Sequence, residues 1–222
     1  MIIPQSARDA AGVDLDHCAA VGRLDAGWAC SGVLVHPRIV LTTAHGRYWS
    51  PLPRAVALNT ADLTQPGAEI IPGRFISHPS YTGRGAYDIA AMILDRPAEA
   101  KPVDLASTRE IAEATHVTLA GFGACVEIRG SGLKIRRSTR VPIRSGDALS
   151  RRFDPDLELI VGADDRGACF GDSGGPAYIG SNGQRKLAAI ISRPLAAQKP
   201  YCKGPAILTR VDSFASWIQS LI

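Results

Sequence analysis

The sequence has no apolar run of 18 residues, so it contains no candidate for a membrane-spanning helix. Residues 1–16 lack a basic stretch followed by an apolar one, and we recognise no signal peptide there. No pair of cysteine or histidine residues has zinc-ligand spacing, so we expect no metal. Aromatic residues make up 6% of the chain and do not interleave with its basic residues. We therefore expect neither nucleic acid nor a membrane as a partner.

The net charge of +4 is unevenly distributed along the chain. Residues 129–152 contain eight basic residues and one acidic residue, Asp147, which makes this segment +7 and the remainder −3. One interpretation is a solvated loop and strand pair. The other is a binding site for an acidic partner or substrate beside the functional site.

Short apolar runs separated by turn residues, among 22 Gly and 15 Pro, predict many strands rather than helices. The runs divide into two sets of six on either side of a linker at 95–109, rich in Ala, Pro and charge. The first set is Cys18–Leu24, Cys30–Val35, Ile39–Thr43, Ala55–Leu58, Glu69–Ser77 and Ile89–Leu94. The second set is Val117–Gly121, Leu133–Ile143, Leu157–Val161, Pro176–Ile179, Lys186–Ser192 and Ala206–Val211.

The last residues of the chain predict a helix that Asp212 or Ser213 caps. Apolar side chains recur there at i, i+3, i+4 and i+7, and we expect them to serve only core packing: Phe214, Trp217, Ile218 and Leu221.

A glycine-dense segment at 167–178 carries Ser173 and can turn sharply enough to bring backbone N–H groups close to a bound carbonyl. A serine hydroxyl is a poor nucleophile until a base removes its proton, and that base needs an orienting acid. A β-branched run ends in His45, and Asp88 stands at the start of an apolar strand. The five histidines all precede Ser173, which excludes an α/β-hydrolase despite the G-x-S-x-G pattern at 171–175.

Three motifs in this order resemble the trypsin/chymotrypsin family of serine endopeptidases: TTAHG at 42–46, DIAA at 88–91 and GDSGGP at 171–176. Further landmarks at 30–35, 121–123 and 189–192 extend the resemblance from about Val21 to the C-terminus. It implies an all-β fold, with two six-stranded antiparallel β-barrels in one peptidase domain over 1–222. The first barrel would span about 17–95, the second about 110–211 and a C-terminal helix 212–222. The active site would lie in the cleft between the barrels.

The resemblance implies peptide-bond hydrolysis through an acyl-enzyme, without a cofactor. His45 would act as general base and acid, Asp88 would orient its imidazole, and Ser173 would attack the scissile carbonyl. Backbone N–H groups of Gly171 and Ser173 would form the oxyanion hole. The partner would be a protein or peptide substrate.

In the family, the residue at Asp172 pairs with an N-terminal amine that propeptide cleavage frees. The usual IVGG-like start is missing, since residues 2–5 read IIPQ. We infer that either activation differs or the chain is an inactive precursor.

Five cysteines exclude a complete set of intrachain disulfides. By resemblance, Cys169 and Cys202 form the bridge that braces the substrate pocket. Cys30 would be a free thiol, because Gly46 replaces its usual partner, and Cys18 and Cys125 would either pair or stay reduced. The resemblance favours secretion, whereas the missing bridge and the plain N-terminal segment allow an intracellular enzyme.

By alignment, the specificity pocket has Gly167 at its base, with walls formed by Ala168, Ser192, Arg193, Pro194 and Ala206. No aspartate stands at its base, so we expect cleavage after small or apolar residues rather than after Lys or Arg. Arg166 and Arg193 leave an acidic preference open. Pro194 has no N–H to donate to the substrate backbone. The alternative function is a protease-fold binding protein with little turnover that uses the basic segment 129–152.

Overall fold

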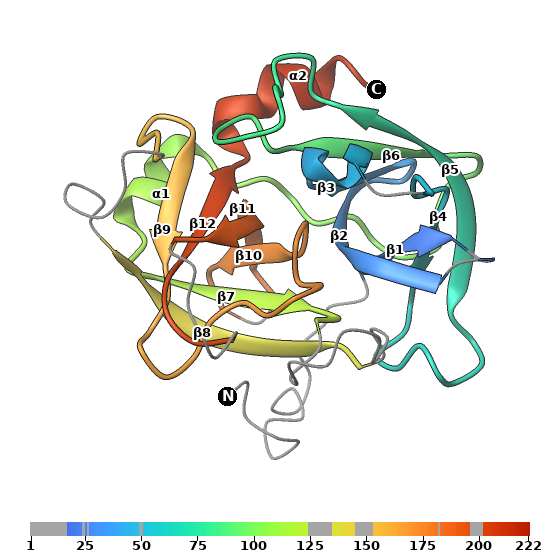
Figure 1. Cartoon of the computed structure of the whole chain (residues 1–222), viewed down its shortest axis with the longest axis horizontal. Coiled ribbons are helices and arrows are strands. Elements are labelled where there is room, and N and C mark those ends of the chain that lie inside the picture. The colour runs from blue at the N-terminus through green and yellow to red at the C-terminus, as the bar shows by residue number, and fades with distance from the viewer. Residues whose placement is uncertain are drawn as a thin grey trace.

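The computed structural model describes residues 17–23, 25, 27–48, 51–123, 135–144, 153–181, 183–195 and 202–222. Over these ranges the chain forms two closed six-stranded antiparallel barrels, joined by an extended linker (Figure 1). The predicted all-β double barrel is therefore confirmed. None of the helices in the described ranges is long and apolar enough to cross a membrane.

The first barrel has the strand order β1-β2-β3-β6-β5-β4. Its strands match the predicted runs closely, because each run alternates or continues apolar residues that the barrel interior buries. β2 begins three residues earlier than predicted, and β6 one residue later. The strands are β1 (Cys18–Arg23), β2 (Gly27–His36), β3 (Ile39–Thr42), β4 (Ala55–Leu58), β5 (Glu69–Ser77) and β6 (Ala90–Leu94).

The second barrel has the order β10-β11-β12-β9-β8-β7. Its strands are β7 (His116–Gly121), β8 (Arg137–Arg144), β9 (Glu158–Val161), β10 (Pro176–Ile179), β11 (Lys186–Pro194) and β12 (Ala206–Arg210). β8 begins four residues later than predicted, and β11 extends two residues further, through Pro194, which pairs with Ala206 on β12.

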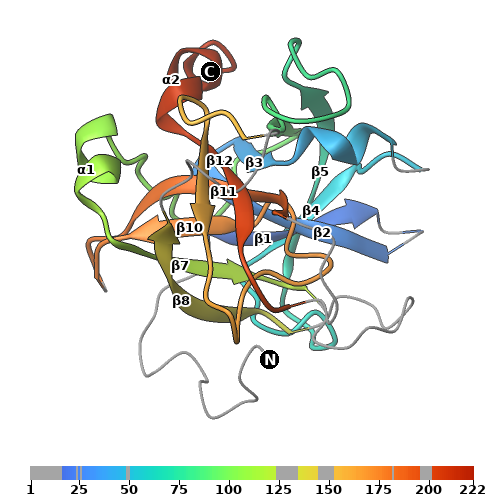
Figure 2. The same cartoon turned by 60° about the vertical axis from the view of Figure 1, so that its left-hand side comes forward.

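A short helix that the sequence reasoning missed, α1 (Thr108–Glu113), ends the linker on the outside of the second barrel (Figure 2). The sequence does contain a signal for the start of this helix, Ser107 followed three residues later by Glu110. Ser107 accepts a hydrogen bond from the Glu110 backbone N–H, and the Glu110 carboxylate accepts one from the Ser107 N–H, which is a capping box. Lys186 on β11 pairs with Glu110 at 2.6 Å and anchors the helix.

The C-terminal helix α2 (Ala215–Gln219) follows a 3₁₀ turn, η2 (Asp212–Phe214). The predicted side-chain cap is wrong, because Phe214 occupies the N-cap position and no side chain caps the helix. Asp212 instead pairs with Arg210 at 2.7 Å, and the Ser213 hydroxyl donates to the Asp156 carbonyl at 2.6 Å. The predicted packing role of the apolar stripe is confirmed by the core cluster that contains Phe214, Trp217, Ile218 and Leu221.

One core cluster crosses from one barrel to the other. It joins Leu41 and Ile89 of the first barrel to Tyr178, Leu187 and Ile190 of the second. Burial of this shared apolar surface holds the two barrels together. Both halves of the chain can therefore contribute side chains to the junction between the barrels, which we call the seam.

Candidate active site

His45 lies in a 3₁₀ turn, η1 (Ala44–Tyr48), directly after β3, and Asp88 lies just before β6. Asp88 accepts two hydrogen bonds from His45. Its Oδ1 accepts from the backbone N–H and its Oδ2 lies 2.8 Å from Nδ1 of the ring. The Asp88 side chain is 4% exposed, whereas that of His45 is 29% exposed. The carboxylate therefore fixes the ring through Nδ1, while Nε2 lies 3.4 Å from the Thr43 Oγ1.

The backbone is unusual immediately before Asp88. Tyr87 has a φ of +65°, which is rare for a residue with a side chain, and the Ile89 N–H donates to the Tyr87 carbonyl at 2.7 Å. The Tyr87 ring stacks on His78 with centroids 5.3 Å apart and meets Phe214 edge-on at 5.7 Å. These ring contacts hold the tight turn that directs Asp88 inward. The sequence does not reveal this role of Tyr87, because nothing in it marks a tyrosine that adopts a positive φ.

Two hydroxyls from the second barrel also hold Asp88. The Ser192 Oγ donates to Oδ2 of Asp88 at 2.6 Å, and the Thr209 Oγ1 donates to its main-chain carbonyl at 3.1 Å. Ser192 was predicted as a pocket residue, and its contact with Asp88 is an additional finding. Thr209 was not predicted. The Asp88 carboxylate is thus fixed by hydrogen bonds from both barrels.

Ser173 lies in the loop before β10, and a serine on β2 ties this loop to the first barrel. The Ser31 N–H donates to the Ser173 carbonyl at 3.0 Å, and its hydroxyl donates to the Gly171 carbonyl at 3.0 Å. Gly174 has a φ of +80°, and a Cβ there would lie 2.3 Å from the Thr42 hydroxyl. Only glycine fits this crossing. The loop is therefore fixed against the strand that leads to His45.

The predicted Cys169–Cys202 disulfide is confirmed, with Cα atoms 4.3 Å apart. Cys30 is a buried free cysteine, as predicted, and its Sγ lies 3.5 Å from the Thr42 hydroxyl. Burial raises the pKa of the Cys30 thiol to about 12. Cys18 is buried, but Cys125 lies outside the described residues, so their pairing stays a prediction.

A cavity of about 130 Å³ opens beside Ser173. Gly167, predicted as the base of the pocket, is not among its lining residues, and a Cβ there would approach the Gly204 carbonyl to 2.4 Å. Lys203, which the sequence reasoning missed, adds an exposed cation to the lining. The lining residues are Ala168, Cys169, Phe170, Ser173, Ile191, Ser192, Arg193, Pro194, Cys202, Lys203, Gly204, Pro205 and Ala206.

Arg193 and Arg166 are the two residues that left an acidic preference open. The Arg193 guanidinium forms a bidentate pair with Glu158 at 2.6 and 3.1 Å, and the Glu158 side chain is 0% exposed. Arg193 also donates to the Gly85 carbonyl of the first barrel at 3.3 Å. Arg166 pairs with Asp165 at 3.6 Å and does not line the cavity. Both guanidinium groups are thus paired with carboxylates of the protein, and neither is positioned to bind an acidic substrate side chain in the cavity.

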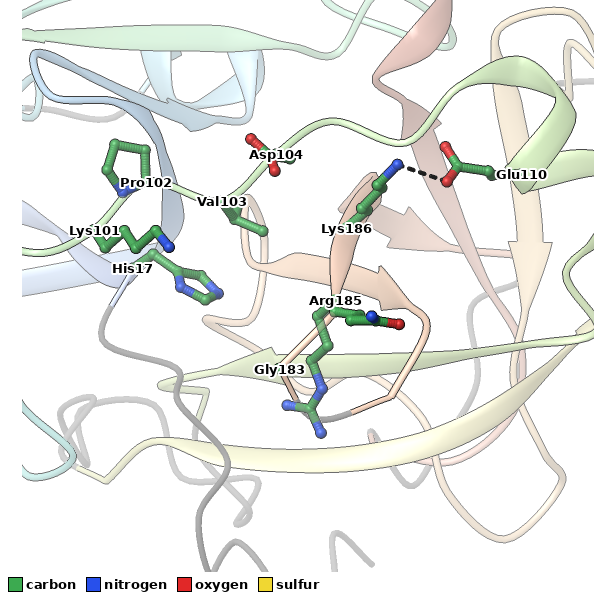
Figure 3. Close-up of a pocket in the computed structure, with 10 residues that line it drawn as sticks. His17, Lys101, Pro102, Val103, Asp104, Glu110, Gly183, Arg185 and Lys186 are labelled. Carbon is green, nitrogen blue, oxygen red and sulfur yellow. Dashed lines mark hydrogen bonds and ion pairs between the residues drawn. The ribbon is translucent and has the colours of Figure 1, made fainter.

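A second cavity, of about 540 Å³, is lined by His17, the linker and the turn before β11, and shares no described lining residue with the first (Figure 3). Figure 3 shows Lys101, Asp104 and Arg185 around it, together with the Lys186–Glu110 pair. Hydrogen bonds from Lys186 and from Ser107 lower the pKa of Glu110 to about 2. The described residues that line this cavity include no serine, no cysteine and none of the predicted triad. It therefore does not compete as an active site.

Two closed barrels with a serine loop and a His–Asp pair at their seam define the architecture of the trypsin-like serine proteases. A family model described as Trypsin matches residues 9–218, and the chain belongs to this family.

The chain is 32% identical to human Serine protease 56 over 210 residues, which cover 86% of the chain and 34% of that protein. It is 30% identical to human Granzyme M, over 86% of the chain and 79% of that protein. It is also 28% identical to Glucanase inhibitor protein 1 of Phytophthora infestans, over 86% of the chain and 77% of that protein. The chain thus spans about a third of the length of Serine protease 56.

Proposed function

We propose that the chain is a serine endopeptidase that cleaves peptide bonds through His45, Asp88 and Ser173. The observation that carries the proposal is the double hydrogen bond from His45 to the buried Asp88 carboxylate, with Nδ1 at 2.8 Å. This contact favours the tautomer with the ring proton on Nδ1, in which Nε2, 3.4 Å from the Thr43 Oγ1, carries the lone pair that a base needs. Membership of a family of serine proteases supports the same chemistry.

In the proposed mechanism, His45 Nε2 takes the hydroxyl proton as the Ser173 Oγ bonds to the substrate carbonyl carbon. The developing oxyanion accepts hydrogen bonds from the Gly171 and Ser173 N–H groups. The His45 imidazolium then protonates the leaving amine, and the C–N bond breaks. Water attacks the acyl-enzyme by the same steps in reverse, with the proton passing again through His45 to Ser173.

We propose small or medium apolar residues before the scissile bond. The cavity of about 130 Å³ is lined by Ala168, Ile191 and Ala206, and none of the described residues that line it is a carboxylate. A buried Lys or Arg side chain would therefore lose its hydration without gaining a partner. Profiling a peptide library tests this preference. Dominant cleavage after Lys or Arg would contradict it, whereas cleavage after Asp or Glu would implicate Lys203.

The second candidate is a protease-fold binding protein with little turnover. Pro194 favours it, because a residue without an N–H removes one hydrogen bond to the substrate backbone. One relative is itself named as an inhibitor protein. The basic segment 129–152 was predicted as its binding surface, but most of that segment lies outside the described residues.

A fluorophosphonate probe separates the two candidates, because it phosphonylates a serine only where a base activates the hydroxyl. We expect stoichiometric labelling of the intact chain and none of the Ser173→Ala variant or of heat-unfolded protein. A folded chain that binds no probe would support the binding protein instead. Labelling that persists in Ser173→Ala would refute the assignment of the nucleophile.

A further inference from the structure

Asp172, directly before Ser173, is a buried carboxylate at 4% exposure. It accepts hydrogen bonds from the backbone N–H groups of Cys169 at 2.7 Å and of Gly123 at 2.8 Å. Burial raises the pKa of Asp172 to about 6, although these two N–H groups and the charge of Arg137 oppose the rise. A buried anion that is held only by neutral donors is costly, so a nearby cation decides how far it stays ionised.

The β7–β8 ladder places Arg137 on the same side of the sheet as this carboxylate. Arg137 lies directly opposite Gly121, and opposed residues of an antiparallel pair project from the same face. A Cβ on Gly121 would lie only 2.4 Å from the Asp172 Oδ1. The Arg137 side chain therefore leaves its strand on the face where Asp172 is buried.

Arg137 and Asp172 also both bind the backbone of Gly123, one through its carbonyl and the other through its N–H. The Arg137 Nη1 donates to the Gly123 carbonyl at 3.4 Å, while the Gly123 N–H donates to Asp172. Both side chains line one small cavity of about 10 Å³ together with Gly121. Among the described residues, Arg137 is the charged side chain that acts on Asp172, whose other partners are backbone amides.

We propose that Arg137 is the built-in counter-ion of Asp172 and thereby a positioning residue for the Ser173 loop. The ionised carboxylate holds the Cys169 and Gly123 amides, and these contacts fix the backbone that presents Ser173. The charge comes from a strand of the barrel itself, so it is present whenever the second barrel is folded. The positioning role rests on the proposed function, whereas the counter-ion role does not.

The counter-ion role is tested by the pH dependence of unfolding, measured in a Ser173→Ala background to prevent self-cleavage. The Asp172 pKa is higher in the folded than in the unfolded state, so stability from the protonated carboxyl is present at low pH and is lost as pH rises through about 6. Arg137→Met should move this loss about one pH unit higher. Arg137→Lys should leave it in place. Arg140→Met is the matched control, because Arg140 lies on the same strand, is exposed and points to the opposite face.

The same substitution in an Asp172→Asn background shows whether the shift in the pH dependence of unfolding comes from Asp172. In that background, Arg137→Met should not shift it. An equal displacement with and without Asp172, or in Arg140→Met, would overturn the counter-ion role.

The positioning role is tested by the rate of fluorophosphonate labelling at pH 7. Arg137→Met should lower this rate about twofold, because a rise of the Asp172 pKa from about 6 to about 7 lowers its ionised fraction at pH 7 from about 0.9 to about 0.5. Arg137→Lys should restore most of it, and Arg140→Met should leave it unchanged. Normal labelling of Arg137→Met, together with the displaced unfolding profile, would refute the positioning role. If the unsubstituted chain is never labelled, the proposed function fails, and the unfolding profile still decides the counter-ion role.

Discussion

The hydrogen bond from Ser192 to Asp88 offers a direct test of how the second barrel supports the His45–Asp88 pair. Ser192→Ala removes a 2.6 Å bond to the buried carboxylate and leaves both His45 donors in place. A hydrogen bond to a charged group contributes about 1.5–3 kcal/mol. If all of this acts on the orientation of Asp88 in the transition state, kcat should fall about 10- to 100-fold. The melting temperature should fall by about 3–12 °C.

Thr209→Val is the matched control for this experiment. Thr209 and Ser192 are both buried, and both hydroxyls donate to Asp88, but the Thr209 hydroxyl reaches the main-chain carbonyl at 3.1 Å instead of the carboxylate. Thr209→Val should therefore lower stability by about 1 kcal/mol and change kcat much less. The assay is hydrolysis of a peptide substrate, with Tm measured on the same preparations. A Ser192→Ala variant that loses stability but keeps the parent kcat would refute the reasoning.

Three further predictions follow from individual residues. Tyr87→Gly should be more stable than Tyr87→Ala by about 1 kcal/mol, the reverse of the usual order, because only glycine adopts a φ of +65° without strain; equal denaturation midpoints would contradict this. The Cys30 thiol should resist alkylation at pH 8 in the folded protein and react in denaturant, as intact mass would show, since burial raises its pKa to about 12; rapid alkylation of the native protein would mean that the thiol is accessible. Arg193→Ala should destabilise the fold by about 3 kcal/mol because it leaves Glu158 buried and unpaired, and adding Glu158→Gln should recover most of the loss in a thermal unfolding assay; no recovery would refute the pairing argument.

The barrels could be predicted from the sequence because their strands carry a local signal. β4 and β5 begin and end where their β-branched and apolar runs predict. The helix α1 also had a local signal, the Ser107-x-x-Glu110 capping box, which was overlooked in a segment interpreted as linker. The helix cap at Asp212 failed for a different reason. Asp212 and Arg210 are only two residues apart, and their ion pair takes the carboxylate that would otherwise cap the helix.

The contacts that support the candidate site have no such local signal. Ser31 is a single serine in the mostly apolar strand β2, and only the fold brings it to the loop of Ser173, 142 positions later in the chain. Arg193 was interpreted as a residue facing the pocket, because the sequence does not show that Glu158 lies buried beneath it on a neighbouring segment. Such partners are fixed by strand register, which depends on the whole barrel.

The same dependence on both barrels links stability to reactivity in this chain. Asp88 takes donors from His45 of the first barrel and from Ser192 of the second, while the Ser173 loop is tied to Ser31 of the first. A small displacement of one barrel against the other would distort the bonds that cross between them, from Ser192 to Asp88 and from Ser31 to the Ser173 carbonyl, and hydrogen bonds weaken steeply with distance and angle. The apolar cluster across the seam, in which Leu41 shares a core with the second barrel, resists that displacement. Substitutions of Leu41 in this cluster should therefore reduce the reactivity of Ser173 before they unfold either barrel.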